Sequence, residues 1–333
     1  MPEKRFLVVR LGSLGDIVHT FPAVAGLRQS FPSADIIWLT HPRWVQLVEA
    51  SGLATDIWAV DSRSLPNVGH ILARVRSLVW DASIDYQGLW KSSLLPFLGG
   101  TRRRIGFSAA TVREYGVPIL YTDRVECRTR HVADQNGELT LRAGAVNPVS
   151  NFSLKIPSCD EAFVRQQLAT GGASRYIVLS PGGGWRSKCW PADRFGLLSQ
   201  KIHDGLGLRC VINYGPGEDS LVDSVRASSV NSQPLAYDGE LGQLMALLRN
   251  ASCIVGGDTG PLHLAVALGV PAVALFGPTD PARNGPYSAR EIVLRSPSAV
   301  TTYKRGEYPD PSLLEVSVDQ VYEAVQRRLG VTA

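Results

Sequence analysis

The stretch VGGDTGPLHLA, residues 255–265, decides how the rest of the chain is interpreted. The apolar residues 253–255 predict a short buried strand that runs into a glycine turn. Pro261 then stands at a typical first position of a helix. A strand, a glycine turn and a helix in this order direct backbone N–H groups and the positive end of a helix dipole towards an anion. The turn also carries a carboxylate, a hydroxyl and an imidazole, from Asp258, Thr259 and His263.

The same alternation of strand and helix recurs along the whole chain. Strands are expected at 6–9, 35–40, 56–60, 82–86 and 102–107, and again at 176–180, 209–213, 253–255 and 272–276. Helices are expected at 17–29, 43–51 and 69–80, and again at 193–204, 218–229, 240–249, 261–268 and 318–329. Strands that alternate with helices predict an α/β fold in which each half is a parallel, doubly wound sheet.

The length of 333 residues is more than one hydrophobic core usually covers, so two domains are expected. Prolines and glycines punctuate residues 145–175 around a single helical segment at 160–169. This junction predicts one domain over 1–168 and a second over 172–314.

The composition is that of an ordinary globular protein, with 44% apolar and 19% charged residues. A net charge of +4 is too small to indicate nucleic acid, but it suits an acidic ligand or an anionic membrane surface. The 5 cysteines form no CxxC pair and are odd in number, which favours a reducing cytosol. No signal peptide and no apolar run of about 18 residues is expected, so any membrane contact would be peripheral.

The loop GSLGD, residues 12–16, follows the first strand, where open α/β sheets bind ligands. It is not GxGxxG, and no acidic residue ends the second strand, so a nicotinamide cofactor is disfavoured. Asp16 is either a helix N-cap or a general base that removes the proton from a sugar hydroxyl. His19 is the other candidate base, unless it is simply a partly buried histidine.

A second glycine turn, SPGGGWRSK, covers residues 180–188. Gly183 and Gly184 allow the backbone to approach phosphate closely, and Arg186 and Lys188 supply positive charge. The spacing is not that of a P-loop, and such loops are often only turns. Glu218 follows another strand and either accepts hydrogen bonds from ribose hydroxyls or is an acid in the first turn of a helix.

Arginines 102–104 and Arg113 form a basic patch in the first half. Together with Lys91 and Arg10, expected at the same sheet edge, they suit a multiply anionic acceptor, although runs of charge are often only solvated surface. Three other classes of site are poorly supported: the sequence has no HExxH or paired zinc spacing and no GxSxG. No Asp-x-Asp pair stands near the glycine turns, so a divalent metal is not required.

Five motifs in order resemble those of the lipopolysaccharide heptosyltransferase family. They are residues 9–23 (VRLGSLGD followed by HT and PA), 84–92 (IDYQGLWKS), 188–191 (KCWP), 258–267 (DTGPLHLAVA) and 276–281 (FGPTDP). Within that family, Gln87-Gly88 and residues 111–114 are most similar to the first heptosyltransferase. The loop 182–185 departs from the family, because it is richer in glycine than the threonine-containing loop expected there.

The resemblance implies a GT-B fold of two Rossmann-like domains with a cleft between them, and a C-terminal helix, residues 315–333, that packs back on the first domain. It implies inverting, metal-independent transfer from ADP-L-glycero-D-manno-heptose to a Kdo residue of lipid A, without a cofactor. The enzyme would be cytoplasmic and peripheral on the inner face of the inner membrane.

Site residues carry over by position. Asp16 is the implied base, and Lys188 neutralises the leaving diphosphate. The donor would be bound by Gly183, Gly184, Glu218, Asp258, Thr259, Gly260 and His263. The acceptor would be bound by Arg10, Ser13, Gln87, Lys91, Arg102, Arg104 and Arg113. Two alternatives stay open: a related transferase with another nucleotide-sugar or acidic acceptor, and a non-catalytic nucleotide-sugar or lipid A-binding protein. The oligomeric state also stays open.

Overall fold

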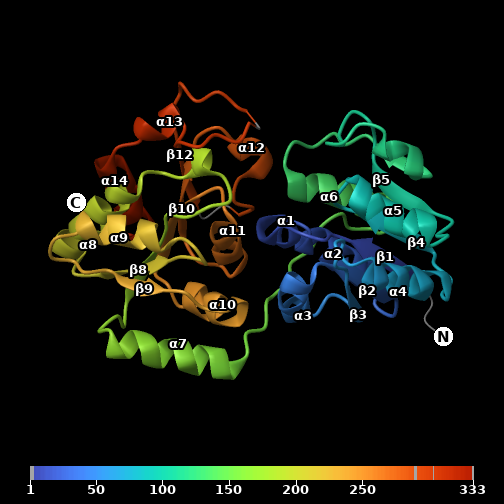
Figure 1. Cartoon of the computed structure of the whole chain (residues 1–333), viewed down its shortest axis with the longest axis horizontal. Helices are drawn as coiled ribbons and strands as arrows, with labels where there is room; N and C mark the ends of the chain where they lie inside the picture. The colour runs from blue at the N-terminus through green and yellow to red at the C-terminus, as the bar shows by residue number, and fades with distance from the viewer. Residues whose placement is uncertain (1–3, 289–290, 303, 332–333) are drawn as a thin grey trace. The chain divides into compact units, whose positions relative to one another are not determined.

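The computed structural model describes residues 4–288, 291–302 and 304–331. The first residues of the predicted first domain and the last residues of the predicted C-terminal helix lie outside these ranges. The chain forms two compact units, Met1–Lys155 and Ile156–Ala333 (Figure 1). Each unit holds one six-stranded sheet, and the paired strands of both sheets are parallel in the described part of the chain. The predicted α/β class, with a doubly wound parallel sheet in each half, is confirmed.

The first sheet has the strand order β3-β2-β1-β4-β5-β6. Its strands are β1 (Arg5–Val9), β2 (Asp35–Thr40), β3 (Asp56–Ala59), β4 (Ala82–Asp85), β5 (Arg104–Phe107) and β6 (Asp123–Val125). Val9, at the end of β1, is in register with Leu39 of β2 and Asp85 of β4. The chain changes direction across the sheet between β1 and β4, and open α/β sheets bind ligands at such a point, outside the carboxyl ends of the strands.

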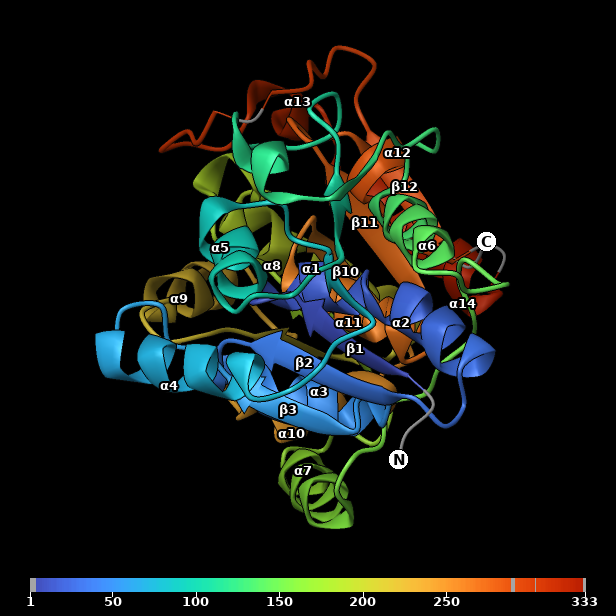
Figure 2. The same cartoon turned by 90° about the vertical axis from the view of Figure 1, so that its right-hand side faces the viewer.

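Helices cover both faces of this sheet (Figure 2). They are α1 (Leu14–Val18), α2 (Phe21–Ser30), η1 (Pro42–Trp44), α3 (Val45–Ser51), α4 (Leu65–Arg76), α5 (Trp90–Leu98), η2 (Val117–Leu120) and α6 (Val132–Arg142). The helix predicted at 17–29 is two helices, because Pro22 lies in the first turn of α2 and not within a continuous helix.

The second sheet repeats the topology, with the order β12-β11-β10-β7-β8-β9. Its strands are β7 (Tyr176–Ser180), β8 (Arg209–Asn213), β9 (Leu235–Tyr237), β10 (Cys253–Gly257), β11 (Ala272–Phe276) and β12 (Glu291–Arg295). Its helices are α7 (Ser158–Thr170), η3 (Arg186–Lys188), α8 (Ala192–Leu206), α9 (Asp219–Ala227), α10 (Leu241–Arg249), α11 (Gly260–Ala267), α12 (Pro281–Asn284), α13 (Pro311–Leu314) and α14 (Val318–Leu329). Here β7 and β10 are the adjacent central strands, and every residue of both is buried.

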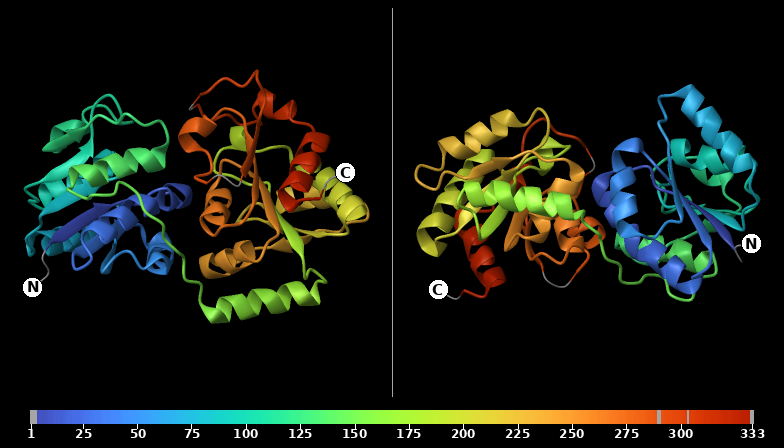
Figure 3. Two further views of the ribbon diagram at one scale, coloured as in Figure 1. Left: turned by 180° about the vertical axis from the view of Figure 1, so that it is seen from behind. Right: turned by 90° about the horizontal axis from the view of Figure 1, so that it is seen from below.

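Packing of the C-terminal helix on the first domain stays a prediction. Helix α14 packs against α8 and strands β10 to β12 of the second unit (Figure 3). Its buried residues Val321, Ala324 and Val325 belong to the hydrophobic core that β7, β8 and β10 line. This apolar stripe covers a face of the second sheet that would otherwise be exposed to water.

The two compact units divide after Lys155, whereas the sequence analysis places its domain boundary near residue 170. Helix α7 packs against α10, so it belongs to the second unit (Figure 3). Its buried residues Val164 and Leu168 supply the contact face. No helix among the described residues is both long and apolar enough to cross a membrane.

Candidate functional site

The turn after β1 carries an ionised carboxylate at the start of α1. Ser13 is the N-cap of α1 and Asp16 is its third residue, so Asp16 is not the N-cap. The Asp16 carboxylate accepts hydrogen bonds from the Ser13 backbone N–H at 3.0 Å and from the Ser13 hydroxyl at 2.9 Å. These two hydrogen bonds fix the orientation of the Asp16 carboxylate at the start of α1.

Arg10 is the main charged partner of Asp16. Its Nη2 lies 2.6 Å from Asp16 Oδ1, and its Nη1 donates to the backbone carbonyl of Tyr86. The Arg10 side chain is 6% exposed, whereas that of Asp16 is 34% exposed. Burial raises the pKa of Asp16, but the positive charge of Arg10 and the Ser13 hydrogen bonds outweigh it, and the resulting pKa is about 2. Asp16 is therefore ionised at neutral pH and still reachable from solvent.

The turn after β4 is tied to the turn after β1 through Gln87, whose Oε1 accepts from the Leu11 backbone N–H at 2.8 Å. Beneath it, buried Asp85 accepts from the Gln87 N–H at 2.9 Å and from the Tyr121 hydroxyl at 2.6 Å. Burial raises the pKa of Asp85 despite these donors. Asp85 thus supports the turn from below, a role that the sequence did not suggest.

The structure brings together only part of the predicted acceptor set. Arg10, Ser13 and Gln87 meet around Asp16, and the charge of Arg113 lowers the pKa of Asp16, which places it close by. Lys91 is exposed in the first turn of α5.

The prediction that the arginine run 102–104 shares the sheet edge of Arg10 is wrong. β5 is parallel to β4 and begins at Arg104, so the run lies at the amino-terminal edge of the sheet, opposite Asp16. The Arg104 guanidinium donates to the carbonyls of Leu120 and Thr101, and Arg102 is exposed.

The His19 side chain is buried and is largely shielded from solvent at this turn. It is 5% exposed, and its ring packs edge-on against the ring of His131, with 5.3 Å between the centroids. The interpretation of His19 as a buried structural residue fits these contacts better than a role as the base.

In the second unit, the turn after β10 forms a compact charged cluster. Asp258 Oδ2 lies 2.7 Å from Lys188 Nζ, and Asp258 Oδ1 lies 3.0 Å from His263 Nε2. The Asp258 side chain is 8% exposed. Burial raises its pKa, but the His263 hydrogen bond and the Lys188 charge outweigh burial and hold that pKa far below its usual range. Asp258 thereby fixes a cation beside the N-terminus of α11, which begins at Gly260 with Thr259 as its N-cap.

Glycines let the two turns of this unit approach each other. A Cβ on Gly257 would lie 2.6 Å from the Lys188 carbonyl oxygen, and one on Gly183 would lie 3.0 Å from Thr259 Cγ2. A Cβ on Gly184 would meet nothing within 4 Å. The buried Thr259 hydroxyl has no hydrogen-bond partner in the described part of the chain. An unsatisfied buried hydroxyl beside a helix N-terminus and a cation indicates a ligand-binding position.

Glu218 stands at the start of a helix, and its role as a ribose ligand stays a prediction. It is the N-cap residue of α9, and its carboxylate accepts from the Gly215 N–H at 2.8 Å. It also lies against the first glycine turn, because a Cβ on Gly182 would come within 2.3 Å of Glu218 Oε1. It therefore stands beside the turns after β7 and β8.

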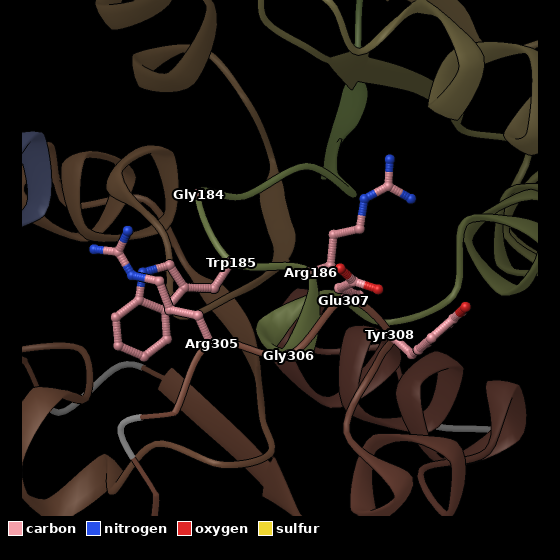
Figure 4. Close-up of a pocket in the computed structure, with 7 residues that line it drawn as sticks. All are labelled: Gly184, Trp185, Arg186, Arg305, Gly306, Glu307 and Tyr308. Carbon is pink, nitrogen blue, oxygen red and sulfur yellow. The ribbon is translucent and has the colours of Figure 1, made fainter.

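An open hollow of about 530 Å³ adjoins the Lys188 loop (Figure 4). It is lined by Gly184, Trp185, Arg186, Arg305, Gly306, Glu307 and Tyr308. Sequence reasoning named Trp185 as part of the glycine turn and Arg186 as a positive charge of that turn, and it missed Arg305 and Tyr308. No pattern in the sequence links the loop around residue 305 to the loop around residue 185, so no sequence signal could have found this hollow.

The sequence model of glycosyltransferase family 9 (heptosyltransferase) matches residues 68–309 of this chain. The chain belongs to this family. It is therefore a glycosyltransferase, as its sequence motifs predicted. The match spans the turn after β4 and all of the second-unit site, and the turn after β1 lies before it.

Three similar proteins illustrate the relationship. Lipopolysaccharide heptosyltransferase 1 of Pseudomonas aeruginosa is 26% identical over 305 residues, which cover 88% of this chain and 84% of the relative. Lipopolysaccharide heptosyltransferase 3 of Escherichia coli is 22% identical, with 84% of this chain and 85% of the relative covered. The solved structure of the E. coli ADP-heptose lps heptosyltransferase II superposes with a TM-score of 0.80 at 20% identity, covering 98% of both chains. This last likeness supports the fold.

Proposed function

We propose that this family 9 chain transfers L-glycero-D-manno-heptose from ADP-heptose to a Kdo residue of the lipid A inner core, in lipopolysaccharide biosynthesis. The observation that carries the proposal is the cation Lys188, fixed by Asp258 beside the N-terminus of α11 and the unsatisfied Thr259 hydroxyl. A diphosphate leaving group requires this combination of charge and N–H donors. The names of the relatives support heptose, ADP and lipopolysaccharide as the chemistry involved.

On the donor side, Lys188 and the backbone N–H groups at Thr259 and Gly260 would bind the diphosphate. Asp258 and His263 would hold the sugar and keep Lys188 in place, and Glu218 would accept hydrogen bonds from the ribose. Gly183 and Gly184 leave room for phosphate against the backbone. Because these positive groups exist before the donor binds, a metal ion is not needed to balance the diphosphate charge.

On the acceptor side, Asp16 would accept the proton of the attacking hydroxyl. A pKa of about 2 describes Asp16 while Arg10 neutralises it. The carboxylate of Kdo would compete for Arg10 and for Arg113. This competition would weaken the ion pair between Arg10 and Asp16, so Asp16 would become more basic when the acceptor is present.

The proposed step is a single displacement with inversion at the anomeric carbon. The acceptor oxygen forms a bond to that carbon as its proton passes to Asp16. The bond from the anomeric carbon to the phosphate oxygen breaks, and its electron pair leaves with ADP. Because Asp16 and Lys188 lie in different units, the reaction requires both units to engage one pair of substrates.

Peripheral attachment to the inner face of the inner membrane is part of the proposal, since the acceptor is a lipid. The first unit exposes large apolar side chains on α5, on η2 and in the loop just before η2, namely Trp90, Phe97, Ile119 and Tyr115. The Arg104 guanidinium lies 5.3 Å from the Phe97 ring. Aromatic residues beside arginine suit the boundary between anionic headgroups and acyl chains.

The test is product formation by the purified enzyme with ADP-heptose and Kdo-lipid A, in the presence of EDTA. The proposal expects heptosylated lipid A, ADP release at a rate insensitive to EDTA, and an anomeric configuration opposite to that of the donor. A preference for an acceptor that already carries heptose would instead contradict Kdo as the sugar that receives the heptose. Binding of both substrates without turnover would favour a non-catalytic binding protein, and preference for another nucleotide-sugar would change the donor.

A further inference from the structure

A pair of cations shares one aromatic ring beside the proposed donor site, and the sequence motifs do not account for it. Lys188 Nζ lies 4.5 Å from the centroid of the Trp185 ring, and Arg305 Cζ lies 5.2 Å from it. Both distances are within the range of a cation–π contact. Figure 4 shows Trp185 and Arg305 together at one side of the hollow, although they come from distant parts of the sequence.

The loop that carries Arg305 is held against the Lys188 turn by hydrogen bonds from its backbone N–H groups to Ser187. The Gly306 N–H donates to the Ser187 hydroxyl at 3.4 Å, and the Asp310 N–H donates to the Ser187 carbonyl at 3.2 Å. Farther back, the Thr302 N–H donates to the Pro278 carbonyl at 2.8 Å. The position of Arg305 next to Trp185 is therefore set by the backbone of both loops.

The two cations differ in how their charge is balanced. The Lys188 ammonium is already matched by the Asp258 carboxylate at 2.7 Å. Arg305 is exposed and forms no ion pair with any carboxylate that the structure describes. Arg305 therefore carries the uncompensated positive charge of the group formed by Lys188, Asp258 and Arg305.

We propose that Arg305, held on the Trp185 ring, is a second diphosphate-binding cation that acts together with Lys188. This inference rests on the proposed function, because it concerns the same donor. A cation–π contact uses none of the guanidinium N–H groups as hydrogen-bond donors, so they stay available to bind two phosphate oxygens at once. Lys188, as a compact point charge, supplies electrostatic attraction but not this planar geometry. Trp185 is a positioning residue for both cations.

Calorimetric titration of the full chain with pyrophosphate, ADP and adenosine tests the proposal. Arg305→Ala is expected to weaken ADP and pyrophosphate binding about tenfold at low salt, which corresponds to one charge-assisted phosphate contact. Adenosine binding should not change, and the loss should shrink as ionic strength rises. Arg305→Lys should recover only part of the affinity. Lys304→Ala, a matched change of an exposed cation in the same loop, should leave all three affinities near those of the wild type.

The outcomes separate this inference from the proposed function. We call the joint binding of the diphosphate by Lys188 and Arg305 the clamp. If the wild type transfers heptose but Arg305→Ala binds ADP normally, the clamp is wrong and the proposed function stands. An equal loss of affinity for adenosine and for ADP in Arg305→Ala would also overturn the clamp, since it would mean that Arg305 contacts the adenine base. If pyrophosphate binding depends on Arg305 but ADP-heptose is not a substrate, the clamp stands and the proposed donor is wrong. Failure of the wild type to bind either ADP or pyrophosphate would refute both.

Discussion

Replacement of Asp16 by asparagine separates its proposed chemical role from its structural one. The change keeps the size of the side chain and an oxygen that can accept the Ser13 N–H, but it removes the charge that faces Arg10 at 2.6 Å. A general base contributes about 10²–10⁴-fold to a rate, so kcat should fall by that factor. ADP affinity should stay unchanged, because the proposed ADP-binding residues all lie in the second unit.

The stability effect of Asp16→Asn follows from the shift of the Asp16 pKa from 3.8 to about 2. That shift corresponds to about 2.5 kcal/mol at neutral pH, and solvent screening of a side chain that is one-third exposed reduces it to about 1 kcal/mol. The folded-state pKa lies below the unfolded-state value. The stabilisation is therefore complete above about pH 5 and is lost as the pH falls towards 2. Urea unfolding of the wild type and the variant should differ at pH 7 and converge near pH 2.

The matched control is Asp35→Asn. Asp35 pairs with Arg5 at 3.0 Å, at the opposite end of β1 from Arg10. Its loss should cost up to about 1 kcal/mol of stability without an effect on kcat. The assignment of Asp16 as the base is refuted if Asp16→Asn retains kcat within about threefold of the wild type. It is also refuted if kcat and ADP affinity fall in parallel, since Asp16 would then act through the structure.

Three further perturbations test other parts of the interpretation. Lys188→Met should lower kcat by about 10²–10³-fold in a heptose-transfer assay, because a preformed charge beside the leaving group is lost; a loss confined to KM would contradict this. Gly257→Ala, whose Cβ would lie 2.6 Å from the Lys188 carbonyl oxygen, should cost about 1–3 kcal/mol in urea unfolding and weaken ADP binding, whereas Gly184→Ala, with open space around its Cβ, should leave the free energy of unfolding unchanged. Phe97→Ser should reduce sedimentation of the protein with phosphatidylglycerol vesicles about fivefold. The control Val79→Ser, which changes a residue of the same unit that is 85% exposed, should not reduce it. Equal vesicle binding by both variants would contradict the membrane role of α5 and η2.

The sequence predicted the local structure of the site because its signals are short-range. The glycine turns after β1, β7 and β10 come directly after apolar runs, and each chemical group lies within a few residues of its strand. Asp16, Lys188 and Asp258 could therefore be named in advance. The contact of Asp258 with Lys188 at 2.7 Å joins two of these turns and required only that β7 and β10 be neighbours in one sheet.

Predictions that depended on direction or distance across the fold were less successful. The arginines 102–104 were expected beside Arg10, but a parallel β5 places its first residue at the other edge of the sheet. Asp85 could not be identified as a buried support, because its partner Tyr121 lies beyond β5 in the sequence. Likewise, Trp185 and Arg305 meet only through loop packing, which leaves no periodic pattern.

By itself, the sequence determined the α/β class, the repeated doubly wound architecture and the turns that carry the reactive groups. These follow from hydrophobic periodicity and from the backbone freedom of glycine, which are properties of neighbouring residues. Only the tertiary structure decided that α14 completes the core of the second unit, that Arg10 holds the pKa of Asp16 at about 2, and that Arg305 shares a ring with Lys188. Each depends on burial and charge contributed by residues remote in the chain, and those energies exist only once the chain has folded.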